Sequence, residues 1–339
     1  MTAARKTFRR ILLTRIQKLG DCVLFVPVVR AFRRALPDAQ IHVLAGTAVG
    51  KAVFRMCPGV DRIVRTRWPA PRDVRAKLRD VLKLRAGRYD AVFLSTQETG
   101  MALKVWLAGI PFRAGFGSVR HAGAQYRERF PFLLTRVLEQ GEGEHEVPVN
   151  LQLAALAGAD PAEAEFDLRP GETASLKAAG LLQDAGVQGR PFACVHPGAS
   201  SDDRAWDAGH FAEVCDRLAE AGLRVVLIGT EEERERTLAV RQAMRRQAEA
   251  ASLAGRTALP ELAAVLAECA VFAGNDSGPM HLAAAMGAPV AAVFVTGDPR
   301  VWAPWAPPER RRIFTARDAA PQSLADAALE LAEKVGRWR

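Results

Sequence analysis

The sequence contains few cysteines and no long hydrophobic run, and both features limit what the protein can be. Among 339 residues there are five cysteines, an odd number without Cys-x-x-Cys spacing. They indicate neither a disulfide framework nor a zinc site, and they fit a reducing compartment. The longest apolar run, Leu282 to Val295, is too short to span a bilayer. Since the basic segment Met1 to Gly20 also lacks the apolar core of a signal peptide, we expect a cytoplasmic protein whose membrane contact is peripheral.

Several binding motifs are missing as well. The sequence has no Gly-Lys-Ser/Thr signature of a phosphate-binding Walker loop and no Asp-x-Asp motif near a predicted strand end. We therefore expect no bound metal. The sequence also has no recognisable nucleic-acid reading module, so nucleic acid is not an expected partner.

Positive charge is present in excess and is unevenly distributed. Residues 1–150 contain 27 Lys and Arg against 12 Asp and Glu, a net charge of +15, whereas the remaining residues carry −6. The densest stretch, Arg62 to Arg88, holds ten basic and two acidic residues. Such a run is often a solvated helix face, but it also attracts anionic partners such as phosphorylated lipid or a membrane surface.

The length predicts two domains, and the hydrophobic pattern predicts alternating strands and helices in both. This alternation favours an α/β fold with parallel sheets. In the first half we predict strands at Ile11–Thr14, Ile41–Ala45, Asp61–Val64, Ala91–Leu94 and Phe112–Phe116, and helices at Asp21–Leu36, Arg72–Leu84 and Met101–Ala108. In the second half we predict strands at Phe192–His196, Val225–Gly229, Val271–Ala273 and Val290–Val295, and helices at Ala208–Ala221, Leu259–Ala267, Pro279–Met286 and Gln322–Val335. The expected domains are residues 1–165 and 185–318, joined by a linker and followed by a C-terminal helix at 319–339.

Asp21 follows the first predicted strand, at the carboxyl edge where open α/β sheets bind ligands. Its carboxylate is a candidate for chemistry at that edge. An Asp in front of a helix is also a favoured N-cap, so a purely structural role is the alternative.

The segment from His196 to Ser201 follows the first strand of the second half, and Arg204 and Trp206 come shortly after it. Such a loop offers backbone N–H groups, hydroxyls and a cation to a phosphate. A Pro-Gly-Ser stretch is otherwise an ordinary turn.

The segment Gly274 to His281 joins a buried strand to a helix whose start is marked by Ser277 and Pro279. A helix start with free N–H groups is an anion site, and Gly278 allows a phosphate to approach the backbone. His281 lies one turn into the helix and either contacts the ligand or packs in the core. Glu231 and Glu233 follow another strand and either bind a ribose or suit the first turn of a helix.

In this order and spacing, the segments resemble the heptosyltransferase family, glycosyltransferase family nine. The family transfers L-glycero-D-manno-heptose from ADP-heptose to the inner core of lipopolysaccharide. The resemblance spans nearly the whole chain and rests on Ile11 to Asp21 with Pro27-Val28-Val29-Arg30 and Pro37, on His196 to Trp206, and on Asn275 to Leu282 with Gly287-Ala288-Pro289. It implies a GT-B fold, in which two doubly wound Rossmann-like domains face each other across a cleft, and an inverting reaction without metal or cofactor, the ADP-sugar being the substrate.

Roles for individual residues follow from the resemblance. Asp21 matches the catalytic base that accepts the proton of the acceptor hydroxyl. The donor-binding residues implied are Ser200, Ser201 and Arg204 for the phosphates, Asp276, Ser277, Gly278 and His281 for the ADP part, and Glu231 or Glu233 for the ribose. Arg204 stands where the family usually has Lys, and Thr296-Gly297-Asp298-Pro299 replaces a Gly-Pro-Thr-like segment. The basic stretch adds Arg62, Arg65 and Arg67 as candidate acceptor contacts.

The expected partners are ADP-heptose or a related nucleotide sugar, a phosphorylated lipid or oligosaccharide acceptor, and the anionic cytoplasmic face of the inner membrane. Two alternatives differ in their predicted behaviour. A nucleotide-sugar epimerase of the same architecture would convert the donor without an acceptor. A non-catalytic protein would bind anionic lipid or nucleic acid through Arg62 to Arg88 and leave the nucleotide sugar unchanged.

Overall fold

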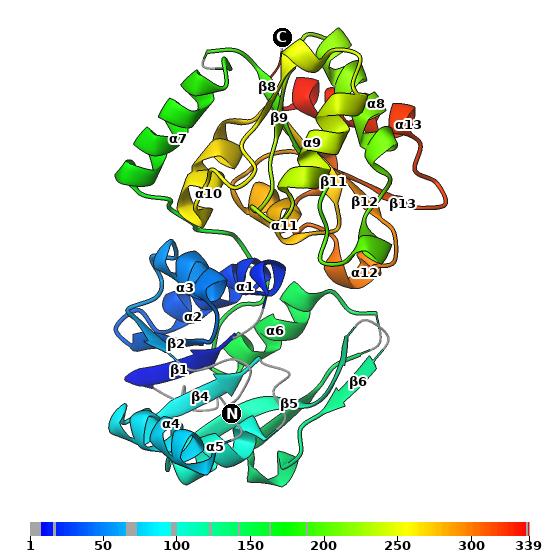
Figure 1. The fold of residues 1–339 in the computed structure, drawn as a ribbon. Helices are drawn as coiled ribbons and strands as arrows, with labels where there is room; N and C mark the ends of the chain where they lie inside the picture. Colours follow the sequence, from blue (N-terminus) through cyan, green and yellow to red (C-terminus); the bar gives the residue numbers. More distant parts are fainter. Residues whose placement is uncertain are drawn as a thin grey trace. The chain divides into compact units, whose positions relative to one another are not determined.

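The computed structural model describes residues 8–15, 18–65, 73–95, 100–121, 124–141, 143–162, 164–187, 189–336 and 338. The chain forms two compact units, Met1–Arg169 (unit 1) and Pro170–Arg339 (unit 2), which Figure 1 shows in blue to green and in green to red. Each unit has its own sheet with helices on both faces.

The sheet of unit 1 has seven strands. They are β1 (Arg10–Thr14), β2 (Gln40–Ala45), β3 (Arg62–Arg65), β4 (Ala91–Leu94), β5 (Phe112–His121), β6 (Ala124–Arg127) and β7 (Arg136–Glu139). Their order is β3-β2-β1-β4-β5-β6, with β7 also paired to β5, and every pair is parallel except β5 with β6. The central strands β1 and β4 are apolar and almost completely buried, as expected for parallel strands covered on both faces.

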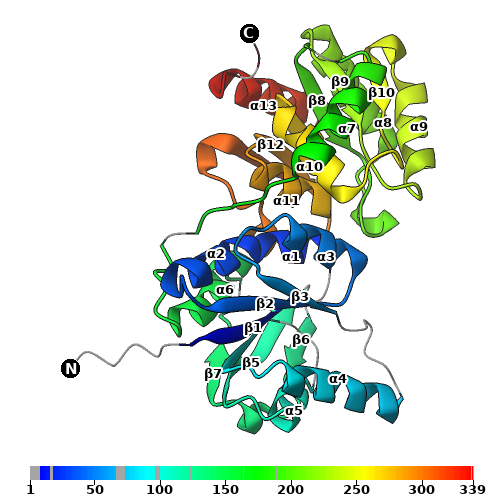
Figure 2. The ribbon, with the colours of Figure 1, turned by 90° about the vertical axis from the view of Figure 1, so that its left-hand side faces the viewer.

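The helices of unit 1 cover its sheet from two sides. They are α1 (Leu19–Leu24), α2 (Val26–Ala35), α3 (Ala48–Arg55), α4 (Val74–Ala86), α5 (Met101–Leu107) and α6 (Glu146–Ala155), with a short 3₁₀ turn η1 (Pro131–Leu133). Figure 2 shows α1, α2 and α3 on one face of the sheet and α4 and α5 on the other. On the α4 and α5 face, Val81, Leu84 and Val105 pack against Leu12 and Val92 of the sheet.

The single helix predicted from Asp21 to Leu36 is wrong, because two helices, α1 and α2, occupy this segment. Phe25 ends α1, and Pro27 lies in the first turn of α2. Proline has no N–H to donate and its ring clashes with the preceding turn, so a continuous helix cannot pass through it. A proline in the first turn is tolerated, and a new helix therefore begins at this position.

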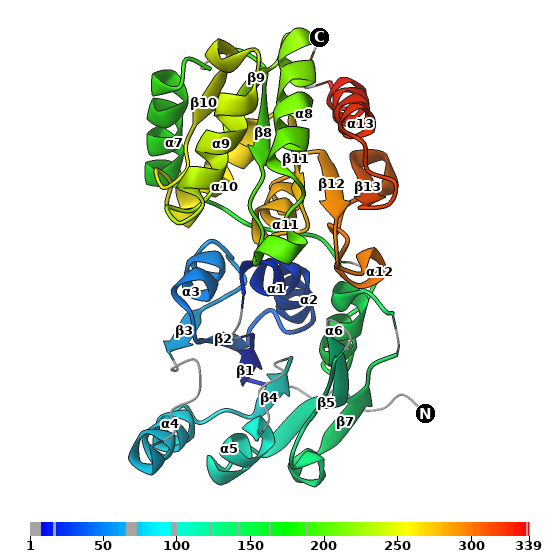
Figure 3. The ribbon, with the colours of Figure 1, turned by 45° about the vertical axis from the view of Figure 1, so that its right-hand side comes forward.

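Unit 2 has six strands, all parallel, in the order β10-β9-β8-β11-β12-β13. They are β8 (Phe192–His196), β9 (Arg224–Leu227), β10 (Ala250–Ser252), β11 (Val271–Asn275), β12 (Val290–Phe294) and β13 (Arg311–Thr315). The helices are α7 (Glu172–Asp184), α8 (Ala208–Glu220), α9 (Arg234–Ala243), α10 (Leu259–Glu268), α11 (Gly278–Ala285), α12 (Pro299–Trp302) and α13 (Pro321–Lys334), with the 3₁₀ turns η2 (Asp202–Arg204), η3 (Gln247–Glu249) and η4 (Pro308–Arg310). The last helix, α13, packs on α8 and on β11, β12 and β13, so it belongs to unit 2 (Figure 3).

Both sheets reverse their strand order at the first strand. In unit 1 the chain runs outward from β1 to β2 and β3 and then returns to β4, and in unit 2 it runs from β8 to β9 and β10 and returns to β11. Ligands of open α/β sheets bind at this switch point, beyond the carboxyl ends of the strands. The loops after β1 and β4, and those after β8 and β11, therefore hold the candidate sites.

Candidate active site

In unit 1, the residues after β1 form a buried charged cluster around Arg15. The Arg15 Nη2 group donates to Asp21 Oδ1 at 3.0 Å and to Glu146 Oε2 at 2.9 Å. Its Nη1 group donates to the backbone oxygen of Ser95 at 2.8 Å and to Ser95 Oγ at 3.0 Å. Asn150 donates to Glu146 Oε2 at 3.0 Å. One cation thus holds two carboxylates, and all five side chains are buried.

The charge of Arg15 is strongly favoured in this cluster. Burial lowers the pKa of the guanidinium, but the nearby carboxylates of Asp21 and Glu146 outweigh that effect and raise the pKa above its ordinary value.

Asp21 is not the N-cap of α1, the alternative considered from the sequence. The N-cap is Lys18, and Asp21 occupies the third helical position, from which its Oδ2 accepts the backbone N–H of Lys18 at 3.2 Å. The carboxylate therefore has a structural bond at each oxygen, one to Lys18 and one to Arg15. Each carboxylate oxygen has two lone pairs, so further acceptor capacity remains.

In unit 2, Arg204 and Asp276 form an ion pair that joins the loop after β8 to the end of β11. Asp276 is buried, whereas Arg204 is partly exposed. The Nε atom of Arg204 is buried and has no hydrogen-bond partner among the described residues. Gly297, in the loop after β12, lies against this pair, because a Cβ there would be 2.3 Å from Asp276 Oδ2 and 3.3 Å from Arg204 Nη2.

The start of α11 faces the same loop. Ser277 is the N-cap residue of α11, as predicted, and a proline follows in the first turn. The Ser277 hydroxyl bonds to His196 Nδ1 at 3.0 Å and makes no capping bond to the helix. The backbone N–H groups and the positive dipole end of α11 are thus available to an anion.

His196 connects Ser277 to Glu233. The His196 Nε2 atom lies 3.3 Å from Glu233 Oε2, which also accepts the backbone N–H of Thr230 at 2.8 Å. Although partial burial raises the pKa of Glu233, the bonds from His196 and Thr230 lower it overall, to about 2. Gly198 leaves room for this carboxylate, because a Cβ at that position would lie 2.0 Å from Glu233 Oε1.

Asn275 fixes the position of the loop after β8. It is completely buried, donates to the backbone oxygens of Pro197 and Gly198 at 2.9 and 3.1 Å, and accepts the backbone N–H of Trp206 at 3.0 Å. The sequence analysis did not identify Asn275, His196 or Gly297 as site residues. The available signal for Asn275 was a polar side chain at the end of an apolar strand, immediately before Asp276.

The other predicted donor residues lie around this group with different exposure. Ser200 and Ser201 are exposed in the loop that leads into η2. Glu231 is exposed and pairs with Arg234 at 2.9 Å, whereas Glu233 faces His196. His281 is buried in the second turn of α11, and Gly278 is partly exposed at its first position.

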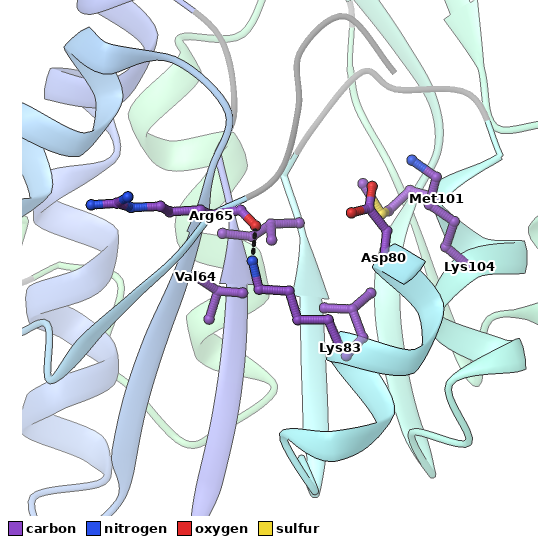
Figure 4. Close-up of a pocket in the computed structure, with 8 residues that line it drawn as sticks. Val64, Arg65, Asp80, Lys83, Met101 and Lys104 are labelled. Atoms are coloured by element: carbon purple, nitrogen blue, oxygen red, sulfur yellow. Dashed lines mark hydrogen bonds between the residues drawn. The ribbon is translucent and has the colours of Figure 1, made fainter. Parts of the chain in front are cut away.

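The structure describes two of the three predicted acceptor residues. Arg62 and Arg65 are exposed at the two ends of β3, and Arg67 lies outside the described residues. Figure 4 shows a pocket beside β3, lined by Leu44, Val64, Arg65, Asp80, Lys83, Leu84, Met101 and Lys104. Arg65 contributes its backbone oxygen, which accepts from Lys83 Nζ at 2.5 Å, and its guanidinium points away from Lys83 and Lys104 (Figure 4).

Comparisons with known proteins agree with this architecture. The family model of glycosyltransferase family 9 (heptosyltransferase) matches residues 77–326. A lipopolysaccharide heptosyltransferase 3 of Escherichia coli is 26% identical over 290 residues, covering 84% of this chain and 83% of the relative. Solved structures confirm the predicted α/β GT-B fold class. The E. coli ADP-heptose lps heptosyltransferase II has a TM-score of 0.80 at 23% identity, and E. coli heptosyltransferase WaaC with ADP has a TM-score of 0.73 at 20% identity, each covering 96% of this chain and 99% of the solved chain.

None of the described helices is both long and apolar enough to cross a membrane.

Proposed function

Because the chain belongs to glycosyltransferase family 9, the heptosyltransferase family, we propose that it transfers a heptose from ADP-heptose to the inner core of lipopolysaccharide. The chain is a glycosyltransferase. Relatives that cover most of its length are named lipopolysaccharide heptosyltransferases, and the name of one similar structure includes ADP-heptose. The family match gives no support to an epimerase or to a non-catalytic lipid-binding protein.

The donor diphosphate binds in unit 2, and a single observation carries this assignment. The buried Arg204 Nε group has no acceptor among the described residues, although Asp276 holds the same guanidinium in place. A buried donor without a partner costs about 1–3 kcal/mol. A phosphate oxygen would satisfy it, with the uncapped start of α11 supplying further N–H groups. Ser200, Ser201, Gly278 and His281 complete the proposed donor site, and Glu231 or Glu233 contacts the ribose.

The acceptor binds in unit 1, where Asp21 acts as the base. The acceptor hydroxyl oxygen attacks the anomeric carbon of the heptose as its proton passes to the Asp21 carboxylate. The bond between that carbon and the diphosphate oxygen breaks, and ADP leaves with the bonding electrons. The hydrogen bond from Arg15 keeps the Asp21 carboxylate oriented until it takes the proton. Arg204 and the start of α11 stabilise the negative charge that develops on the leaving diphosphate.

The domain roles follow from this scheme. We assign residues 1–165 to the acceptor, residues 185–318 to the nucleotide sugar, and residues 319–339 to a C-terminal helix. The positively charged first half suits a phosphorylated acceptor, and Arg62, Arg65 and Arg67 remain its proposed contacts. A lipid-linked acceptor also implies a peripheral location at the cytoplasmic face of the inner membrane.

Replacement of Asp21 tests the base assignment. Asp21→Asn removes the charge but preserves an oxygen that accepts a hydrogen bond from Arg15 or Lys18, so unit 1 should stay folded. We expect the turnover of heptose transfer to fall by at least about 100-fold, with the KM for ADP-heptose little changed. The matched control is Glu146→Gln, which removes the other carboxylate on Arg15 and should reduce turnover less than about tenfold.

Two results would argue against this scheme. Wild-type turnover in Asp21→Asn would reject Asp21 as the base. An epimerised nucleotide sugar formed without consumption of the acceptor would reject transfer itself in favour of the epimerase.

A further inference from the structure

The helix α4 carries two parallel rows of exposed side chains. Residues four apart in a helix lie on the same side. Val74, Leu78 and Leu82 form an apolar row in which the side chains are 75%, 56% and 54% exposed. Arg75, Arg79 and Lys83 form a basic row one residue further on, and all three are exposed. At 1.5 Å per residue, each row is about 12 Å long.

The side of α4 that faces the sheet is packed in the hydrophobic core. Ala76, Val81 and Leu84 are buried, and Val81 and Leu84 belong to the core cluster beneath the sheet. Rotation of the helix to hide the apolar row would expose these residues instead. The apolar row is therefore an outward face of a well-anchored helix, and exposed apolar surface of this kind marks interaction sites.

The charge of α4 indicates the kind of partner. Residues 74–86 contain five basic side chains and one acidic side chain. A basic helix with an apolar row is the pattern of a helix that lies in the interface of an anionic bilayer, with the apolar side chains inserted and the cations at the headgroups. A protein partner would need a matching acidic and apolar groove, whereas a bilayer supplies both chemistries at once.

Neighbouring elements add surface of the same type. The helix α5 packs against α4, and η1 packs against α5. Figures 1 and 2 show α4 and α5 side by side on one face of the sheet. Trp106 and Leu107 at the end of α5 are exposed, as is Phe132 in η1. Exposed aromatic side chains are typical of protein regions that contact the membrane interface.

We propose that α4 docks unit 1 on an anionic phospholipid surface, with Val74, Leu78 and Leu82 inserted among the headgroups. This inference rests on the proposed function for its purpose, which is to bring the enzyme to a lipid-linked acceptor. The same helix supplies Asp80, Lys83 and Leu84 to the pocket beside β3, so docking would place that pocket next to the membrane (Figure 4).

Vesicle cosedimentation of the full chain tests the proposal. Phosphatidylcholine vesicles with about 30% phosphatidylglycerol should bind the wild type at low salt, and pure phosphatidylcholine vesicles should bind it at least tenfold less. Arg75→Ala/Arg79→Ala should lower the partition coefficient about 25-fold, about fivefold for each cation removed. Leu78→Gln/Leu82→Gln should lower it at least about tenfold, since glutamine keeps helix propensity but does not insert.

Matched controls lie in unit 2. Leu176 and Leu238 are exposed on α7 and α9, and Arg190 and Arg241 are exposed as well. Leu176→Gln/Leu238→Gln and Arg190→Ala/Arg241→Ala repeat each chemical change elsewhere and should leave the partition coefficient within about twofold. Thermal unfolding of each variant checks that the fold is retained.

The proposal is overturned if the wild type does not bind anionic vesicles, or if the α4 variants bind like the controls. It is also overturned if the wild type is a dimer that the leucine variants separate, because a second copy would then cover this face. Heptose transfer to an acceptor without acyl chains distinguishes a failure of the docking proposal from a failure of the proposed function. The α4 variants should keep that activity, whereas its absence in the wild type would reject the proposed function and leave docking intact.

Discussion

Arg15 determines the electrostatics of the proposed base. It is the one described cation in contact with both Asp21 and Glu146, and it is almost completely buried. Two buried carboxylates without their cation would repel each other and lose charge-assisted hydrogen bonds. We therefore expect the arginine to be essential to the fold of this edge of the sheet.

Replacement of Arg15 by methionine should consequently destabilise unit 1. Removal of one partner of a buried ion pair typically costs about 3–5 kcal/mol, and here two carboxylates lose the same partner. Chemical denaturation monitored by circular dichroism measures the loss in free energy of unfolding. Arg15→Lys should lose less, because lysine keeps the positive charge but lacks the planar guanidinium that bonds several acceptors at once. Equal midpoints for Arg15→Met and wild type would mean that the cluster contributes nothing.

Arg204 poses a different problem, because lysine is the family's usual residue at this position. Arg204→Ala should weaken ADP binding by about 30-fold, equivalent to about 2 kcal/mol, through loss of the phosphate contact. Arg204→Lys keeps the charge and should bind ADP within about tenfold of wild type. Isothermal titration calorimetry with ADP distinguishes these outcomes. Unchanged affinity in Arg204→Ala would remove this residue from the donor site.

Glu233 should give the protein a specific sensitivity to acid. Its pKa in the folded protein is about 2, below the ordinary value of 4.5. The stabilisation is therefore fully present above about pH 4.5 and is lost as the pH falls through 2, up to about 3 kcal/mol in total. Glu233→Gln should be less stable than wild type at pH 6, and the difference should shrink towards pH 2 in urea denaturation series. A constant difference across this range would contradict the assigned cause.

The sequence predicted those site residues that belong to contiguous motifs, and it missed those that meet only in the fold. Arg204 and Asp276 were identified from their segments, and the structure pairs them. Arg15 and Glu146 are 131 residues apart, and neither was identified as a site residue, although Arg15 lies in the segment from Ile11 to Asp21 that carries the resemblance. His196 was noted only as the start of a loop, because its contacts to Ser277 and Glu233 come from two other strand ends.

The loop after β12 contains Gly297, which lies close to the Arg204–Asp276 pair. Gly297 lies where a side chain would collide with the Arg204–Asp276 pair. Glycine is thus required by space rather than by backbone conformation, and the loop can approach the pair closely.

Gly297→Ala should raise the Kd for ADP by at least about fivefold, because the added methyl group pushes Asp276 and Arg204 apart. Gly180→Ala in α7 is the matched control, since a Cβ there meets no atom within 4 Å. That control should leave ADP binding unchanged and stabilise the fold by about 0.5–1 kcal/mol through higher helix propensity. Identical ADP affinities in both variants would show that the loop tolerates the methyl group.

At the scale of elements, the central strands were predictable and the peripheral elements were not. Strands such as β1, β8 and β12 are buried on both faces and appear in the sequence as continuous apolar runs. The helix α9 buries only Thr237 and Val240, so its sequence lacks a clear apolar period. The strand β13 is only partly buried along its length, and α6 contains Pro148 in its first turn, where proline is tolerated but looks like a helix breaker.

At the scale of the whole molecule, the chain combines two units that differ in charge. The excess of basic residues lies in residues 1–150, and the remainder is acidic overall. A net positive unit suits the phosphorylated acceptor and the anionic lipid that we propose for it, whereas the acidic unit would need local groups to hold the proposed diphosphate. We therefore expect the affinity for the donor to depend on Arg204 and the start of α11. It should depend only weakly on ionic strength, because charges farther from the site than a Debye length are already screened.

The division into two compact units leads to a prediction about ligand-dependent stability. Each unit has its own core, so calorimetry should resolve two overlapping unfolding transitions. ADP at 100 times its Kd should stabilise the transition of unit 2 by about 2.7 kcal/mol, a shift of about 5–10 °C for a unit of this size. UDP, GDP and CDP at the same concentration should give smaller shifts.

Arg204→Ala should reduce the ADP-induced shift and Asp21→Asn should preserve it, because only the first change alters the proposed donor site. Loss of the shift in Asp21→Asn would place the nucleotide in contact with unit 1 and overturn the separation of donor and acceptor roles.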